Sequence, residues 1–490
     1  MPQGYSVYRI IRNTPLSKYF FYALVFLLPF GTGQIYFTDS SFFYNYHIFY
    51  NSFWLYLTDL IFCGLILSWL WESWPFSKVL HRLSTAIREN TIYQFLGVFW
   101  LISLVSVSVS REINLSLYGL WKISEYLLIF IYIREKVDIS REIHRIFWLI
   151  LAISCFEAVL AINQYLLQTS FGLSWAGEPF LRPGLKGLAE FVTAASGIPP
   201  EAGISRETVM LRGYGTFPHP NVLGGFLLLG LMANIGLFMR KGLIVSRETV
   251  LALSLIVITM GLVVSFSRNA WVATVIALII YLVFAVSREI KRKIALLGLV
   301  LAIALAVNLL MFGSEIKDRI SSPPPSPPHQ GEGKTPNYSS PPSVGGEVGD
   351  SDESLQIRKR FSSISREMIQ NRPGFGVGLR NFVVRMDEYN RGDRLLPYLH
   401  QPVHNIYLLI ASEIGIAGLI IFLGIIFYIV RPGSSPIPDR TLPGRHVLLA
   451  IFAGFLFIGL FDHYLFTVQQ GGLMFWITAG LLTAETTGLQ

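Results

Sequence analysis

The sequence predicts an all-α polytopic membrane protein of about twelve transmembrane helices, with both termini in the cytoplasm and a large external loop late in the chain. Hydrophobic residues make up 52% of the 490 residues and charged residues only 14%, whereas a soluble domain carries about 25% charged residues. The mean hydropathy is +0.51. A water-soluble chain could not bury this much apolar surface in one core, so the bilayer is the expected solvent.

Apolar runs of the length that spans a membrane recur along the whole chain. A spanning helix needs about 20 mainly apolar residues. Such runs lie near residues 19–37, 49–71, 92–109, 113–133, 146–167, 221–239, 249–266, 270–286, 294–312, 405–430, 447–461 and 466–485. The first run is longer than a signal-peptide core and no cleavage site follows it, which predicts a permanent helix.

The distribution of basic residues predicts the orientation of these helices. Segments between alternate runs are rich in Lys and Arg, while the short loops on the other side hold only Arg111 and Arg268. Cytoplasmic loops carry such an excess, so the net charge of +8 indicates membrane topology and not a nucleic-acid partner. The [VI]-S-R-E pattern recurs six times on both predicted sides, which favours a tolerated sequence repeat over a binding motif.

Three regions follow from this topology. Residues 1–312 form a membrane domain of nine helices with an external loop at about 169–220. Residues 313–403 form the large external loop, in which the Pro-, Ser- and Gly-rich insert 322–353 is too polar to fold. Residues 404–490 carry the last three helices.

A short amphipathic helix is expected after the insert. Ile357, Phe361, Ile364 and Met368 recur at steps of four, three and four residues, which places them on one helix face. Pro373 ends the helix, and the glycines that follow it predict a tight turn. This helix is expected to lie on the membrane surface or over a cavity.

Candidate site residues appear first at the start of the sixth helix. The segment RGYGTFPHPNVLGG, residues 212–225, contains Arg212, His219 and Asn221. Pro220 and Asn221 also suit a plain helix start, because proline fixes φ and asparagine can cap. That reading does not account for Arg212 and His219.

Two further external segments carry candidate arginines. Arg268 lies in SFSRNAW, where it either reaches the membrane interface or binds an anion, since a guanidinium holds phosphate with two hydrogen bonds. Arg358 and Arg360 lie at the start of the amphipathic helix. A solvated helix face is the competing interpretation for both of them.

His404 stands where the large loop enters the tenth helix, in QPVHNIYLLIASEIGIAGL. A neutral imidazole there can accept a proton at physiological pH. Asn405 either caps the helix or orients the ring, and Glu413, deeper in the span, needs a partner or a cavity. Asp462 and His463, in a short external loop, are candidates for the same site.

Several ionisable residues lie within or near the spans, namely Asp59, Lys122, Glu125 and Glu157. Such residues are either functional or part of packing pairs, and Lys122 and Glu125 are spaced to pair on one helix face. No set of His, Cys and Asp has metal-ligand spacing, and the two cysteines lie in apolar runs. We therefore expect neither a metal nor a cofactor.

Taken in order, four of these pieces resemble the O-antigen ligase and O-antigen polymerase superfamily of bacterial membrane glycosyltransferases. They are RGYGTFPHPNVLG, SFSRNAW, QIRKRF followed by MIQNRPGFGVGLRNF, and VHNIYLLIASEIGIAG. The resemblance extends from about residue 15 to residue 485, and the His-Asn helix start together with the RPGFGVG turn is its most specific part.

The resemblance implies a multi-pass protein of the bacterial cytoplasmic membrane. Its expected donor is a glycan on undecaprenyl pyrophosphate, and its expected acceptor is a hydroxyl of a glycan, a lipid or a protein. Carried over by motif, His404, Arg268 and Arg358 are the implied catalytic residues, with Arg360 as the alternative to Arg358. Arg212, His219, Asn221, Arg360 and Asn405 are the expected substrate-binding residues.

Three functions remain open at this point. The first is a metal-independent, inverting glycan transferase of the ligase type, and the second is a repeat-unit polymerase. The third is a lipid-glycan flippase or transporter. Transporters bind substrate near the midplane between internal repeats, whereas here the halves show no evident repeat and the polar residues gather at one membrane face.

Overall fold

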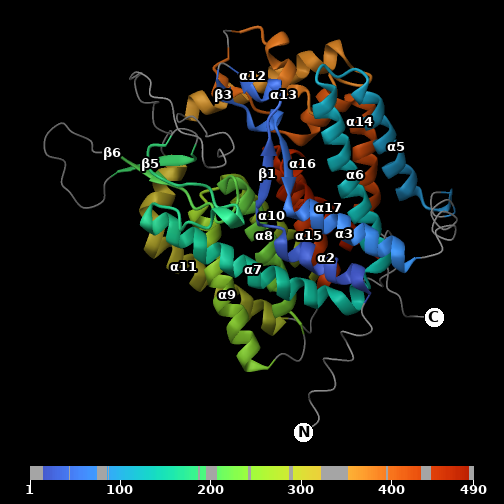
Figure 1. Ribbon diagram of the computed structural model, residues 1–490. Helices are drawn as coiled ribbons and strands as arrows, with labels where there is room; N and C mark the ends of the chain where they lie inside the picture. The colour runs from blue at the N-terminus through green and yellow to red at the C-terminus, as the bar shows by residue number, and fades with distance from the viewer. Residues whose placement is uncertain are drawn as a thin grey trace, which may run out of the picture.

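The computed structural model is a helical bundle with a layer of short elements over one end (Figure 1). It describes residues 15–43, 45–73, 85, 88–185, 188–194, 207–240, 244–285, 291–321, 351–392, 395–431 and 443–484. Its longer helices are α2 (Leu16–Leu27), α3 (Leu57–Glu72), α5 (Thr91–Val107), α6 (Ile113–Lys136), α7 (Ile139–Leu167), α8 (Pro220–Phe238), α9 (Val245–Val264), α10 (Arg268–Ala285), α11 (Lys291–Ser321), α12 (Ser351–Asn371), α14 (Ile406–Val430), α15 (Pro443–Ile458) and α17 (Gln469–Thr483).

Each of the twelve apolar runs contains a helix of the bundle. Six helices of the described chain are long and apolar enough to cross a membrane by length and composition, and α2, α5, α10 and α15 are shorter apolar helices. The prediction of a mostly helical, polytopic membrane protein is therefore confirmed.

The expectation of an all-α chain was wrong for the first two runs. The chain leaves α2 at Leu27 and forms β1 (Gly33–Tyr36), which pairs antiparallel with β4 (Phe53–Tyr56) just before α3. Two more antiparallel pairs are β2 (Phe42–Phe43) with β3 (Tyr46–His47) and β5 (Glu190–Ala194) with β6 (Glu207–Leu211). Aromatic and β-branched residues fit strands as well as helices, so hydropathy alone could not separate the two.

Burial divides the helices into central and peripheral ones. Every residue of α8 and α17 is buried, whereas α11 is mostly exposed and its Leu310 side chain is 87% exposed. Exposed apolar side chains of this density on a helix suit contact with lipid chains. The site described below lies at the ends of the central helices.

One end of the bundle gathers the loops that were predicted to be external. Glu112, in the turn between α5 and α6, donates its backbone N–H to Asn381 Oδ1 at 2.8 Å. Asn405, at the start of α14, donates to the carbonyl of Leu460 after α15 at 3.0 Å. Loops that are distant in sequence therefore form one continuous layer.

The opposite end carries the described members of the basic segments. Lys18 of α2 pairs with Glu142 of α7 at 2.6 Å, and Arg134 of α6 donates to the carbonyl of Thr483 at the end of α17 at 2.9 Å. The start of α2 and the end of α17 thus lie at one end of the bundle.

The amphipathic helix predicted after the insert is α12, and it is longer than expected. Phe361, Ile364 and Met368 are fully or nearly fully buried in a small apolar core that lies apart from the main bundle core. Helix α12 ends at Asn371, before Pro373. In Figure 1 it lies across the top of the bundle near α13 (Phe382–Arg385) and β3.

The glycine-rich turn after α12 docks on a kink in α14. Gly415 has φ +87° inside that helix, and a side chain there would collide with the backbone of Gly374. Val377 N–H donates to the Ser412 carbonyl at 2.8 Å and Gly378 N–H to the Glu413 carbonyl at 3.1 Å. The RPGFGVG motif therefore fixes the external layer on the helix that begins after His404.

Two expected boundaries of the large loop differ in the structure. Helix α11 continues to Ser321, past the predicted loop start at residue 313, with a break in its backbone at Phe312. The insert 322–353 lies outside the described residues up to residue 350, and α12 begins at Ser351.

Candidate functional site

Several segments far apart in the sequence meet in one pocket at the layered end of the bundle. We call it the histidine pocket, and its lining includes Tyr50, His219, Asn221, His404, Asp462 and His463. The lining comes from the loop before β4, the start of α8, the entry to α14 and the turn after α15. It thus combines two of the four sequence segments, at the starts of α8 and α14, with the short loop at residues 462–463.

The start of α8 supplies His219 and Asn221. His219, and not Asn221, caps the helix: its ring Nδ1 accepts a hydrogen bond from Asn221 N–H at 3.1 Å. Pro220 occupies the first helical turn, where its missing N–H costs nothing. This frees the Asn221 side chain for contacts within the site.

Arg212 supports the pocket from behind. Its side chain is only 1% exposed and donates to the Ser265 carbonyl at 2.8 Å and to Asn221 Oδ1 at 2.7 Å. Asn221 in turn donates to Asp462 Oδ2 at 2.9 Å. Arg212 does not line the histidine pocket, and it orients Asn221 and, through it, the carboxylate.

Asp462 is buried with its carboxylate well supplied with donors. Besides Asn221, the His463 N–H donates to Asp462 Oδ1 at 2.8 Å. Burial acts to raise the pKa of Asp462, but the nearby imidazoles of His463, His404 and His219 and the Asn221 amide outweigh it and hold the pKa below its ordinary value. The pocket therefore contains a carboxylate that is ionised at neutral pH.

His463 is a neutral imidazole in this pocket. Burial lowers its pKa, the Asp462 carboxylate opposes this and the charge of Arg358 adds to it, leaving the pKa at about 4. Its Nδ1 lies 2.8 Å from Thr467 Oγ1. The effect of Arg358 also indicates that this guanidinium is close to the pocket.

His404 is half-buried at the entry to α14. Its ring lies edge-on to His463, with centroids 5.2 Å apart, and parallel to Phe361 of α12 at 6.2 Å. Asn405 caps α14, because its Oδ1 accepts from Leu408 N–H at 2.9 Å. The two residues of the His-Asn pair thus have different roles. The His404 ring lines the pocket, and the Asn405 side chain caps the helix.

The pocket lining includes none of the other candidate arginines, Arg268, Arg358 and Arg360. Arg268 is exposed at the first position of α10, and its neighbour Asn269 donates to the carbonyl of Phe461 at 3.3 Å, beside Asp462. Arg358 on α12 acts on His463 as described above. Arg360 instead directs its Nε to Asn390 Oδ1 at 3.0 Å, within the external layer.

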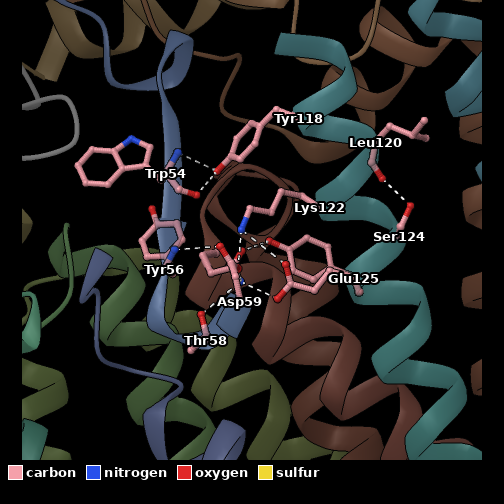
Figure 2. A network of polar contacts seen from close by, with 11 residues as sticks. Trp54, Tyr56, Thr58, Asp59, Tyr118, Leu120, Lys122, Ser124 and Glu125 are labelled. Atoms are coloured by element: carbon pink, nitrogen blue, oxygen red, sulfur yellow. Dashed lines mark hydrogen bonds and ion pairs between the residues drawn. The ribbon is translucent and has the colours of Figure 1, made fainter. Parts of the chain in front are cut away.

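A second polar cluster lies between α3, α6 and α17 (Figure 2). Lys122 Nζ is 2.6 Å from Asp59 Oδ1 and 3.5 Å from Glu125 Oε2. Gln469 donates to Asp59 at 2.8 Å and to Glu125 at 2.9 Å. These residues are almost fully buried and carry opposite charges side by side, although Glu125 Oε2 has no hydrogen-bond partner among the described residues. The charge pairing favours a packing role over chemistry for the expected Lys122–Glu125 pair.

Next to this cluster lies a smaller pocket, the aromatic pocket. It is lined by Trp54, Tyr56, Tyr118, Tyr126 and the cations Lys122 and Arg380, among others. Arg380 lies in the GLRNF end of the glycine-rich motif, so a sequence signal for it existed and was missed. Tyr50 and the tyrosines of the aromatic pocket carried no such signal.

Glu413 and Glu157 find partners in the protein. Glu413 Oε1 accepts from Phe382 N–H at 3.2 Å, and Glu157 Oε2 accepts from Thr216 N–H at 2.8 Å. Among the described residues, no group of three or more His, Cys, Asp and Glu side chains is arranged to hold a metal ion.

Residues 253–423 of the chain match the family model described as O-antigen ligase (Wzy_C). The match includes Arg268, Arg358, Arg360 and His404, and it confirms the resemblance to the O-antigen ligase superfamily. It supports membrane glycan transfer of the ligase or polymerase type in general. No curated protein matches the chain.

Proposed function

We propose that this O-antigen ligase-like membrane protein transfers a glycan from undecaprenyl pyrophosphate to an acceptor hydroxyl on the external face of the bacterial cytoplasmic membrane. The reaction inverts the anomeric centre and needs no metal. The proposal includes a membrane domain of twelve helices with both termini in the cytoplasm, so that the histidine pocket faces outward.

The observation that carries the proposal is the presence of His404 and an ionised carboxylate in one pocket. His404 and Asp462 line the same pocket, and the field of His404 contributes to the low pKa of Asp462. A carboxylate near an imidazole stabilises the imidazolium that forms when the ring takes a proton. His404 therefore acts as general base on the acceptor hydroxyl, a step typically worth about 10²–10⁴-fold in rate.

His463 has a supporting role in this scheme. Its pKa of about 4 keeps it neutral at physiological pH. It therefore does not compete with His404 for the proton of the acceptor hydroxyl. Its edge-on contact limits the orientations open to the His404 ring.

Arg268 and Arg358 stabilise the leaving group. The acceptor oxygen bonds to the anomeric carbon, the bond from that carbon to the phosphate oxygen breaks, and the electron pair leaves with undecaprenyl pyrophosphate. Guanidinium groups bind such phosphate oxygens with paired, charge-assisted hydrogen bonds. The positions of Arg268 at the start of α10 and Arg358 near His463 support this role.

The test is transfer by purified variants in detergent, with an undecaprenyl-pyrophosphate oligosaccharide and a hydroxyl acceptor. His404→Ala and Arg268→Ala should each abolish detectable transfer while expression and thermal unfolding stay normal. His144→Ala, a substitution on α7 at the opposite end of the bundle, is the control. Normal transfer by His404→Ala would refute the general-base assignment. A ladder of product sizes would identify a polymerase, and a single addition a ligase.

A further inference from the structure

The Arg380 guanidinium is a cation inside the aromatic pocket whose donors are not all used. It lines that pocket beside Lys122. Its Nε is buried and has no hydrogen-bond acceptor among the described residues. A buried charged donor without an acceptor in the protein is costly, so such a group takes its acceptor from a water, an ion or a ligand.

The Arg380 side chain packs against a glycine of α6. A Cβ at Gly119 of α6 would lie 2.8 Å from Arg380 Cγ and Cδ, so only glycine admits the arginine against the helix. The guanidinium then rests 5.0 Å from the centre of the Tyr118 ring. Arg380 itself has φ +56°, a conformation that non-glycine residues seldom adopt and that tends to occur at functional sites.

Lys122, the other cation of the pocket, is already matched by acidic partners. Its Nζ contacts Asp59 and Glu125, which lie behind the pocket surface and do not line it. Figure 2 shows the Lys122 side chain running to these carboxylates below Tyr118. Arg380 therefore supplies a positive charge that has no ion-pair partner among the described residues, and the low-dielectric aromatic rings around it strengthen its field.

The aromatic pocket adjoins the histidine pocket. Phe49 lines the first and Tyr50 the second, and along the start of α17 Gln469 lines the first and Val468 the second. Thr467, which lines the aromatic pocket, is hydrogen-bonded to His463 of the histidine pocket at 2.8 Å. A substrate that reaches His404 can therefore extend toward Arg380.

We propose that the aromatic pocket is a subsite for an oxyanion group carried by the substrate, and that Arg380 is the residue that binds this group. The group is either the carboxylate of an acidic sugar or a phosphate of the carrier lipid. The assignment of the group to the glycan-lipid substrate rests on the proposed function. The binding of an oxyanion by Arg380 does not depend on turnover.

The experiment measures oxyanion binding to the full chain purified in detergent. Glucuronic acid is followed by saturation-transfer NMR, with glucose as its uncharged match, and inorganic pyrophosphate by broadening of its phosphorus resonance. The variants are Arg380→Gln and Arg380→Lys. Arg391→Gln is the control, since this exposed arginine in the same external segment pairs with Glu367 at 2.7 Å on the surface. Thermal unfolding verifies that each variant is folded.

We expect Arg380→Gln to weaken at least one of the two anion signals about tenfold or more, Arg380→Lys to weaken it less, and Arg391→Gln to leave it unchanged. Loss of the glucuronic acid signal identifies a sugar carboxylate, and loss of the pyrophosphate signal identifies a phosphate. Binding of both anions that is equal in the wild type and in folded Arg380→Gln would overturn the proposal, as would equal binding of glucose and glucuronic acid without any effect on pyrophosphate.

The proposed function can fail separately from this subsite. His404→Ala should bind the anion as the wild type does, because that ring is not part of the aromatic pocket. Anion binding through Arg380 in a protein that transfers no glycan would leave the subsite standing and remove the transferase assignment.

Discussion

The histidine pocket and the Lys122 cluster both contain buried charge, but the groups that stabilise the charge differ. In the cluster, Lys122 lies between two carboxylates and Gln469 bridges them, so opposite charges are paired inside the protein. In the histidine pocket, Asp462 is held by an amide and by backbone N–H groups, while imidazoles line the space in front of it. The comparison teaches that a buried ionisable residue indicates a role in stability where it is paired with opposite charge, and a candidate reaction site where it borders a pocket.

The largest expected effect is on the rate of glycan transfer, and it should distinguish two arginines of α12. Arg358→Ala should lower glycan transfer by about 10²–10³-fold, the range for loss of one group that stabilises charge in a transition state. Arg360→Ala should lower it far less, because Arg360 Nε is directed to Asn390 at 3.0 Å. Initial rates of transfer measure both. Equal loss in the two variants would contradict the assignment of Arg358.

The Lys122 cluster should respond in stability and not in chemistry. Lys122→Met leaves Asp59 and Glu125 buried without their cation, and breaking a buried ion pair in this way costs about 3–5 kcal/mol. Thermal unfolding in detergent should show a large drop in the midpoint. The paired variant Lys122→Met with Asp59→Asn should recover part of it. A fully stable Lys122→Met protein would show that the cluster is not structural.

The histidine pocket should make the fold sensitive to acid. The pKa of His463 is about 4 in the folded protein, below the ordinary value of about 6.5 expected in the unfolded chain. Between these values the unfolded chain binds the extra proton, so this contribution to stability is complete above pH 6.5 and is lost as the pH falls toward 4.

His463→Asn should therefore flatten the decline of the unfolding midpoint between pH 6.5 and pH 4. His47, whose pKa burial also lowers to about 4, is the matched site outside the pocket. His47→Asn should flatten the same window independently. An unchanged acid slope in the His463 variant would mean that this ring is protonated in the folded protein.

The smallest effect is expected at the insert. Deleting residues 322–350 keeps α12, which begins at Ser351. The transfer rate should stay within about twofold of the wild type, since a segment too polar to bury a core adds little to a packed site. The same transfer assay measures it. Complete loss of activity would show that the insert takes part in the reaction.

Much of the fold was predictable because hydropathy reports burial in lipid directly. Each apolar run contains a helix, and the amphipathic helix around Phe361 ends before Pro373 as its sequence indicates. The strands β1 and β4 were missed because their aromatic residues have the same hydropathy as a span. Strand pairing depends on contacts between distant segments, which a local pattern does not contain.

The site was predictable in its membership more than in its roles. The sequence singled out His219, Asn221, His404, Asp462 and His463, and all five line one pocket. It did not distinguish Arg212, which is buried behind the pocket, from an arginine that faces it. The burial and direction of a side chain follow from packing between helices, which a local sequence pattern does not contain. The position of Arg380 against Gly119 is set by the same packing.

The central claim is most directly tested by following the leaving group in the presence of a chelator. Purified protein would be given an undecaprenyl-pyrophosphate oligosaccharide and an acceptor in detergent with EDTA, and release of the lipid pyrophosphate would be measured together with the new glycan product. We predict stoichiometric release and product formation with an inverted anomeric centre, both abolished in His404→Ala. Binding of the lipid-linked glycan without turnover on any acceptor would contradict the account and favour a lipid-glycan flippase.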